Sequence, residues 1–230
     1  MRRVWVLFVG MGSVAGAAEA GPWAQAPGGI YARAIASAER LDGEDGWRGD
    51  VYAEYGLRHR VTLTAKAESV RYEGGGISDR DAYRFSARKQ LWADNKGWAL
   101  GMEAAAVNGS AVAGVFGCSG WGAEARLAGG RSGVRKGRGY YFFGDAAYIA
   151  HEDGCTRQRL ELGYGADLGK HFFTTQQVWL ERGNHTARSV KFDTQAGYHF
   201  RAFDLSLGYR QEAGGAFNEQ AYLVAVTVRR

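Results

Sequence analysis

The chain has 230 residues, of which 46% are hydrophobic and 23% are charged, and its net charge is +5. This length is enough for one domain with a sizeable core. The basic residues are spread along the chain and form no runs, which argues against nucleic acid as a partner. The chain has 35 glycines but only two prolines, whereas a disordered glycine-rich chain usually carries many prolines too.

Residues 1–20 have the composition of a secretory leader. Arg2 and Arg3 give a positive start, residues 4–18 are mostly apolar, and Ala18-Glu19-Ala20 supplies small residues before a cleavage point. We predict a signal peptide over residues 1–20 and a mature chain that begins at Gly21. The alternative is an uncleaved anchor. It is weaker because the stretch is short and glycine-rich, whereas a spanning helix needs about 20 mainly apolar residues.

From Gly28 onward, apolar residues recur at every second position with polar residues between them, which is the period of a β-strand. In 47–57, for example, Trp47, Val51 and Tyr55 fall on one face and the charged residues on the other. No apolar run is long enough for a membrane helix. The faces of 172–181 cannot be assigned from the alternation. We predict about twelve strands, at 30–38, 47–57, 61–67, 83–88, 98–104, 121–127, 140–148, 159–164, 172–181, 190–200, 203–210 and 222–228.

The predicted connections alternate between tight and longer. The tight ones are 58–60, 93–96, 169–170 and 201–202, and the longer, polar or glycine-rich ones are 41–46, 73–81, 108–119, 183–188 and 213–218. Bacterial outer-membrane barrels show this pattern, with short periplasmic turns and longer external loops. Residues 129–139 break the pattern, because this connection should be short but is long and basic. No proline follows Pro27, and a closed sheet excludes proline because its ladders need every backbone donor.

We therefore predict an all-β fold over residues 21–230: a single antiparallel transmembrane β-barrel of about twelve strands (10–12) in a Gram-negative cell outer membrane. Membrane lipid and the barrel-assembly machinery are its expected partners. The alternative is a soluble β-sandwich or a lipocalin-like periplasmic protein. The membrane barrel is favoured because the more apolar face carries aromatic residues near strand ends and the other face carries the charges.

The opening Gly21-Pro22-Trp23 and the hairpin sequence YAEYGLRHRVTL at 52–63 resemble a group of small alphaproteobacterial outer-membrane β-barrel proteins of unassigned function. The resemblance implies the barrel fold and supplies no catalytic residues. The chain departs from outer-membrane proteins at its end. Such proteins usually finish in an aromatic residue that the assembly machinery reads, whereas this chain finishes VTVRR.

The face opposite the aromatic residues is predicted to line the lumen, and it carries charges of both signs in nearly equal number. Two hypotheses stay open: ion pairs that fill a narrow lumen, or a lining that selects a small polar solute. A channel for one sign of ion would ordinarily show a ring of one sign. The predicted lumen charges are Arg48, Asp50, Glu54, Lys66, Glu68, Arg84, Arg88, Glu103, Glu124, Arg126, Asp145, Arg159, Glu161, Lys191, Asp193, Asp204 and Arg210.

The first functional hypothesis is a narrow channel for small polar solutes, and we expect no enzyme and no cofactor. The alternative is a non-conducting anchor or adhesin that presents external loops. An outer-membrane hydrolase is a weaker hypothesis, because the chain lacks a GxSxG motif and no histidine pair has zinc-ligand spacing. Of the histidines at 59, 151, 171, 185 and 199, only His199 falls on the predicted lumen face.

The two cysteines lie in connections that emerge on the same side of the predicted barrel. Cys118 follows the fifth strand and Cys155 follows the seventh. An even number of cysteines in an exported chain favours a disulfide, because the periplasm oxidises thiols. The alternative is two unpaired thiols that happen to fall in loops.

The leader and the strand pattern together predict a location. The mature protein should fractionate with the outer membrane, begin at Gly21 on N-terminal sequencing, and change its gel mobility on heating, because a closed barrel stays folded in cold detergent. Recovery in the soluble periplasmic fraction would overturn the membrane assignment.

Overall fold

The computed structural model describes residues 21–230 except 76, 110–117, 119, 186–187 and 216. Within this part of the chain all regular structure is β-strand, and no helix is long and apolar enough to cross a membrane. The twelve strands are β1 (Ile30–Leu41), β2 (Glu44–Gly56), β3 (Val61–Tyr72), β4 (Arg80–Ala93), β5 (Trp98–Asn108), β6 (Trp121–Arg135), β7 (Arg138–His151), β8 (Thr156–Asp167), β9 (Phe172–Gly183), β10 (Ser189–His199), β11 (Asp204–Gly215) and β12 (Glu219–Arg229).

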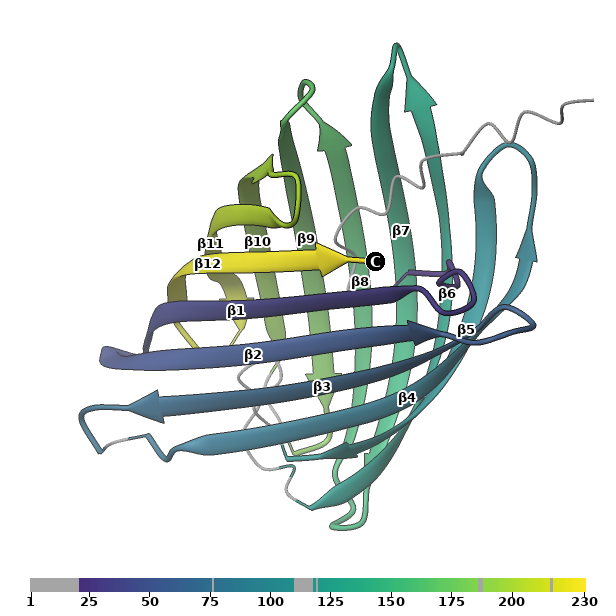
Figure 1. Cartoon of the computed structure of the whole chain (residues 1–230). Helices are drawn as coiled ribbons and strands as arrows, with labels where there is room; N and C mark the ends of the chain where they lie inside the picture. The colour runs from purple at the N-terminus through teal and green to yellow at the C-terminus, as the bar shows by residue number, and fades with distance from the viewer. Residues whose placement is uncertain (1–20, 76, 110–117, 119, 186–187, 216) are drawn as a thin grey trace, which may run out of the picture.

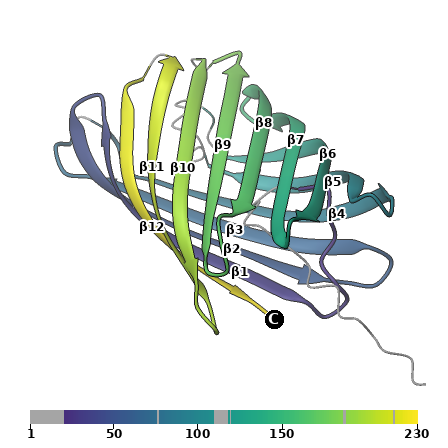
Figure 2. The ribbon, with the colours of Figure 1, turned by 90° about the horizontal axis from the view of Figure 1, so that it is seen from above.

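The strands form one closed antiparallel barrel (Figure 1). Each strand pairs with its neighbours in sequence, and β1 also pairs with β12 from Tyr31↔Arg229 to Leu41↔Glu219. Closure leaves no sheet edge with unpaired backbone groups. The strands of opposite walls cross steeply when the barrel is viewed from the side or from above (Figures 1 and 2), as strands tilted against a barrel axis must.

The two mouths of the barrel differ. Backbone hydrogen bonds of 2.8 and 2.9 Å join Ile30 to Arg230, so β1 starts and β12 ends at the same mouth, here called the terminal end. The opposite mouth, the loop end, carries the connections 42–43, 73–79, 109–120, 152–155, 184–188 and 216–218. Every connection at the terminal end spans four residues or fewer, so the longest connections gather at the loop end.

The predicted number of strands is confirmed, but two predicted connections are wrong. The predicted loop 41–46 is the two-residue turn Asp42–Gly43, with φ of 50° and 93°. The predicted long link 129–139 is mostly strand, and its turn is Lys136–Gly137, with φ of 52° and 74°. Positive φ at both turn residues is the type I′ geometry, whose twist matches that of two-residue hairpins. Glycines inside the strands had concealed the strand pattern.

The outward face is apolar and carries aromatic residues near both mouths. Trp47, Tyr83, Trp121, Tyr148 and Tyr222 lie toward the loop end and are 46–72% exposed. Tyr55, Trp92, Trp98, Phe172 and Phe200 lie toward the terminal end and are 40–60% exposed. Large apolar side chains such as Leu127, Leu160 and Leu207 are exposed between these two groups. An apolar band between aromatic girdles is the surface that a transmembrane barrel presents to lipid.

The predicted disulfide is present. Cys118 and Cys155 are bonded, with their Cα atoms 5.4 Å apart, and both are fully buried. The bond joins the connection after β5 to the turn after β7, across a sequence separation of 37 residues. It therefore ties two neighbouring connections together over the loop end.

Removing the disulfide should destabilise the barrel. For a loop of this length, the loop-closure model gives a loss of about 3–4 kcal/mol in the free energy of unfolding when Cys118→Ser and Cys155→Ser are combined. Urea unfolding in detergent micelles measures it, and reduction of the wild-type protein should give a matching loss. Two free thiols in the denatured, unreduced protein would contradict the assignment.

Candidate functional site

The candidate site is the lumen, where the structure places all seventeen predicted charges on the inward face. Fifteen of them are only 2–8% exposed. The other two, Lys66 and Arg210, have side-chain exposures of 16% and 15%. Alternation along each strand produces this placement, because successive side chains point to opposite faces. The low exposures mean that these side chains fill the space between the walls in this conformation.

One group of lumen charges centres on Arg48 of β2. Its Nε donates to Glu39 at 2.6 Å, and its Nη1 donates to Glu68 at 2.7 Å. Lys66 lies 2.8 Å from Asp50 and 3.5 Å from Glu68. The cations and carboxylates therefore alternate across β1, β2 and β3.

The same group continues over the β1–β12 closure. Glu219 of β12 lies 4.0 Å from Arg48 and accepts a hydrogen bond from Lys191 of β10. Arg210 of β11 donates to Asp193 of β10 at 3.3 Å. One ion-pair network thus joins β10, β12, β1, β2 and β3, and it links the first strands of the chain to the last.

A second group of lumen charges centres on Glu124 of β6. Three guanidinium groups contact its carboxylate: Arg84 at 3.0 Å, Arg126 at 2.9 Å and Arg159 at 3.4 Å. Arg84 also lies 2.8 Å from Glu103 of β5. Arg126 extends the group to β7 and β8, through Asp145 at 3.4 Å and Glu161 at 3.8 Å.

The remaining predicted charges lie toward the terminal end. Arg88 of β4 donates to Glu54 of β2 at 2.6 Å, and the Tyr52 hydroxyl donates to the same carboxylate at 2.5 Å. Asp204 accepts from Arg229 at 2.9 Å. Buried ions are stable only when partners offset the loss of hydration. Each of the seventeen predicted lumen charges lies within 4.0 Å of an oppositely charged side chain.

Other charged residues on the inward face were not predicted from the sequence. They are Arg33, Glu39, Arg157, Glu181, Glu212, Glu219 and Arg229. Glu39 could have been found, because the alternation of the first strand runs on to Leu41. Glu181 could not, because Val178 and Trp179 are both half-buried and blur the faces of β9. The missed residues are again of both signs, so the lumen lining remains mixed.

The histidine assignment needs one correction, because His151 also points inward. It is 6% exposed, and its Nε2 lies 3.3 Å from Arg157. His199 lies inward as predicted, 2.7 Å from Asp204, and stacks on Phe173. The inward ring nitrogens of His151 and His199 thus lie against Arg and Asp side chains. Among the described residues, no three His, Cys, Asp or Glu side chains could hold a metal ion.

Aromatic rings cover glycines on the inner wall near the terminal end. The Phe143 ring lies over Gly163, and a Cβ built on this glycine would be 2.1 Å from it. Tyr141 covers Gly165 in the same way, and Phe173 covers Gly197, each at 2.2 Å. Each ring thus lies against the neighbouring strand where that strand has no side chain, an arrangement known to stabilise glycines in sheets.

Residues 21–29 enter the lumen at the terminal end instead of joining the wall. Gly21 and Pro22 are buried. The backbone N–H of Gln25 donates to Thr62 Oγ1 at 2.9 Å, and its side chain donates to Glu54 at 2.5 Å. The ring of Trp23 packs edge-on against Tyr141, with centroids 6.4 Å apart.

The wall has glycines where this N-terminal segment lies closest. A Cβ at Gly56 would be 1.9 Å from the Ala26 carbonyl oxygen, and a Cβ at Gly101 would be 2.9 Å from the Pro22 carbonyl oxygen. A Cβ at Gly130 would be 2.9 Å from the Trp23 ring. Because three strands leave room for it, the segment is a fitted part of the fold that occupies the terminal-end mouth.

Comparisons with known proteins support the architecture. No protein-family model and no curated protein matches the chain. Among solved structures, the COG4313 outer membrane channel from Pseudomonas putida F1 is similar, with a TM-score of 0.63, 11% identity, and coverage of 90% of this chain and 97% of that one. The KdgM porin has a TM-score of 0.61 and 10% identity, and the NanC porin 0.61 and 11%; each comparison covers 85% of this chain and 98% of the porin. At these identities the likeness shows the fold, a small outer-membrane-type barrel.

The ion-pair geometry predicts unequal costs for removing two arginines. Arg84→Ala leaves Glu103 and Glu124 short of a buried partner, and we expect a loss of about 3–5 kcal/mol in unfolding free energy. Arg40→Ala breaks only an exposed pair with Asp45, with side-chain exposures of 62% and 57%, and should cost far less, because water screens the pair. Urea unfolding in micelles compares the two variants. Equal losses would contradict the network.

Proposed function

We propose that the protein is a narrow channel for small polar solutes in a Gram-negative outer membrane, with the terminal end in the periplasm and the loop end outside. The apolar outward face supports the membrane placement, since it carries aromatic girdles near both mouths. The charged inward face supports a polar path through the barrel. Three of the solved structures that the chain resembles are a channel and two porins, which supports this function.

The N-terminal segment is the observation that carries the channel proposal. The segment lies in the terminal-end mouth and belongs to no strand. Three hydrogen bonds hold Ala24 and Gln25 to the inner wall, and two backbone hydrogen bonds join Gly28 and Gly29 to Gly56. A barrel that served only as an anchor would need no separable part in its lumen. The described conformation is the closed one, and displacement of residues 21–29 opens the terminal-end mouth.

The lumen charges indicate the class of solute. Cations and carboxylates alternate around the wall, so no belt of one sign is present among the described residues. The KdgM porin was solved in complex with oligogalacturonate, an acidic sugar. A polyanion would meet as many carboxylates as cations in this lumen. The mixed lining instead suits a small neutral or zwitterionic solute with hydrogen-bonding groups.

A non-conducting anchor is the second candidate, and a specific observation favours it. Fifteen predicted lumen charges are no more than 8% exposed, so the ion pairs themselves close the path in this conformation. If the network is rigid, the barrel would hold the disulfide-linked loop end at the cell surface and conduct nothing. Conductance separates the two functions.

We predict that small changes in the wall will open the channel by displacing the N-terminal segment. The three heavy atoms nearest to a Cβ built at Gly56 all belong to Gln25 and Ala26, and the three nearest to a Cβ at Gly101 all belong to Pro22. Gly56→Ala and Gly101→Ala should therefore each expel part of the segment and leave the wall intact. In planar lipid bilayers we expect both variants to show larger and longer open states than the wild type.

Gly49→Ala is the matched control, because a Cβ at this position in β2 meets nothing within 4 Å. It should conduct like the wild type. Trp23→Gly, which removes the contact with Tyr141, should open the channel by an independent route. If all three opening variants stay silent while they remain folded and heat-modifiable, the anchor is the correct function. Strong selectivity for one sign of ion in the open variants would contradict the mixed lining.

A further inference from the structure

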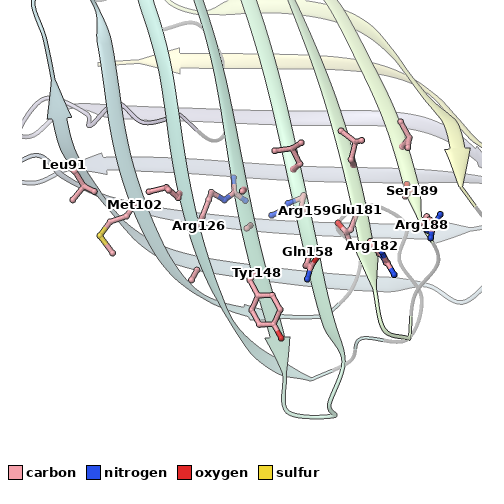
Figure 3. A pocket seen from close by; sticks show the side chains of 17 residues that line it. Leu91, Met102, Arg126, Tyr148, Gln158, Arg159, Glu181, Arg182, Arg188 and Ser189 are labelled. Atoms are coloured by element: carbon pink, nitrogen blue, oxygen red, sulfur yellow. The ribbon is translucent and has the colours of Figure 1, made fainter.

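A groove crosses the outward face of the barrel from β4 to β10, with a volume of about 880 Å³ (Figure 3). Its main row is apolar and runs from strand to strand through paired positions. Met102 is paired with Leu127, Leu127 with Ala146, and Ala146 with Leu160. Leu160 is paired with Leu180, and Leu180 with Val190. Ala146 is the smallest residue in the row, and it lies between Leu127 and Leu160.

The neighbouring row, toward the loop end, changes from apolar to basic. Tyr148 is paired with Gln158, and Gln158 with Arg182, close to the ends of their strands. Arg188 is the last residue of the β9–β10 connection, directly before β10 begins at Ser189. Both arginines are exposed and line the same end of the groove (Figure 3).

Arg182 and Arg188 differ from the other outward-facing arginines near the loop end. Arg40 lies 2.7 Å from Asp45 on the next strand, and Arg71 lies 2.9 Å from Asp81. The cross-strand neighbour of Arg182 is Gln158, which carries no charge. Within the described part of the chain, neither Arg182 nor Arg188 has a carboxylate within ion-pair distance. The groove therefore ends in two uncompensated positive charges.

We propose that this groove is a binding site for a phosphate-bearing lipid of the outer leaflet. An acyl chain of the lipid lies along the leucine row, and its phosphate binds Arg182 and Arg188. The proposal rests on the membrane placement and orientation given above, which put the loop end in the outer leaflet. Guanidinium groups bind phosphate through two parallel charge-assisted hydrogen bonds. The apolar row gains from contact with a chain seated in it.

The proposed lipid site and the lumen use different faces of the same strands. Leu160 and Leu180 point out to the groove, while Arg159 and Glu181, the residues before and after them on the other face, point into the lumen. Arg159 and Glu181 also border the groove, but their side chains are buried and pair with Glu124 and Arg157 in the lumen. Changes at outward-pointing residues of the groove should therefore leave these ion pairs in place. Lipid binding and conduction can be tested separately for this reason.

Native mass spectrometry of the mature protein in detergent, with lipid A as the probe, tests the proposal. We expect wild-type protein to retain lipid A and to hold zwitterionic phosphatidylethanolamine far more weakly. Arg182→Ala with Arg188→Ala should weaken lipid A binding at least about tenfold. Ala146→Trp should weaken it as well, because the ring fills the groove.

The matched control is Arg40→Ala with Arg71→Ala, which removes two loop-end arginines outside the groove and should bind lipid A as the wild type does. Equal retention of lipid A by the Arg182/Arg188 double variant would overturn the proposal. So would a wild-type dimer that Ala146→Trp dissociates, because a second copy would then occupy the groove. Conductance of the double variant should match that of the wild type, so the failure of one proposal does not imply failure of the other.

Discussion

Pairing between β1 and β12 is the constraint on which the rest of the structure depends. This ladder turns a sheet with two edges into a closed wall, and a closed wall has an inside and an outside. Strand alternation then sorts every second residue to one of two surroundings. The same ladder brings the first and last strands together, and the ion pairs around Arg48 and Glu219 bridge this closure from within. The chain cannot complete its lumen network until its C-terminal strand is in place.

Charge in the interior sets the second constraint. A side chain such as Arg126 loses most of its water when it turns inward, and only neighbouring carboxylates can replace it. Because a single substitution leaves another buried ion short of a partner, the network behaves as a unit. The aromatic rings near the terminal end solve a different problem. Phe143, Tyr141 and Phe173 lie over glycines, so they narrow the lumen without crowding it and leave room for the N-terminal segment.

Most of the fold and of the lumen lining could be predicted from the alternation of residues in the sequence. A period of two fixes the face of each residue once a strand is found. It failed where side-chain size, not polarity, decides the outcome. The run Gly129–Arg135 contains three glycines and reads as a loop, yet it continues β6 because its backbone pairs fully with β7. The seating of residues 21–29 could not be predicted. Its signal is the absence of side chains at Gly56 and Gly101, which lie far apart in sequence and border the same segment only in the closed barrel.

The inner and outer faces of β6–β10 show how one pattern can serve two tasks. Inside, neighbouring strands exchange opposite charges, and Arg159 reaches Glu124 across β7. Outside, the same strands present a leucine row, and beside it, toward the loop end, lie two arginines without carboxylate partners. A positive charge that finds no acid on its own chain must be satisfied by water or by an anion, and near a membrane surface the most concentrated anions are lipid phosphates. The charges of the lumen are paired within the chain, whereas the two arginines of the groove are not. The outward arginines are therefore the charges whose energy depends on the surrounding membrane.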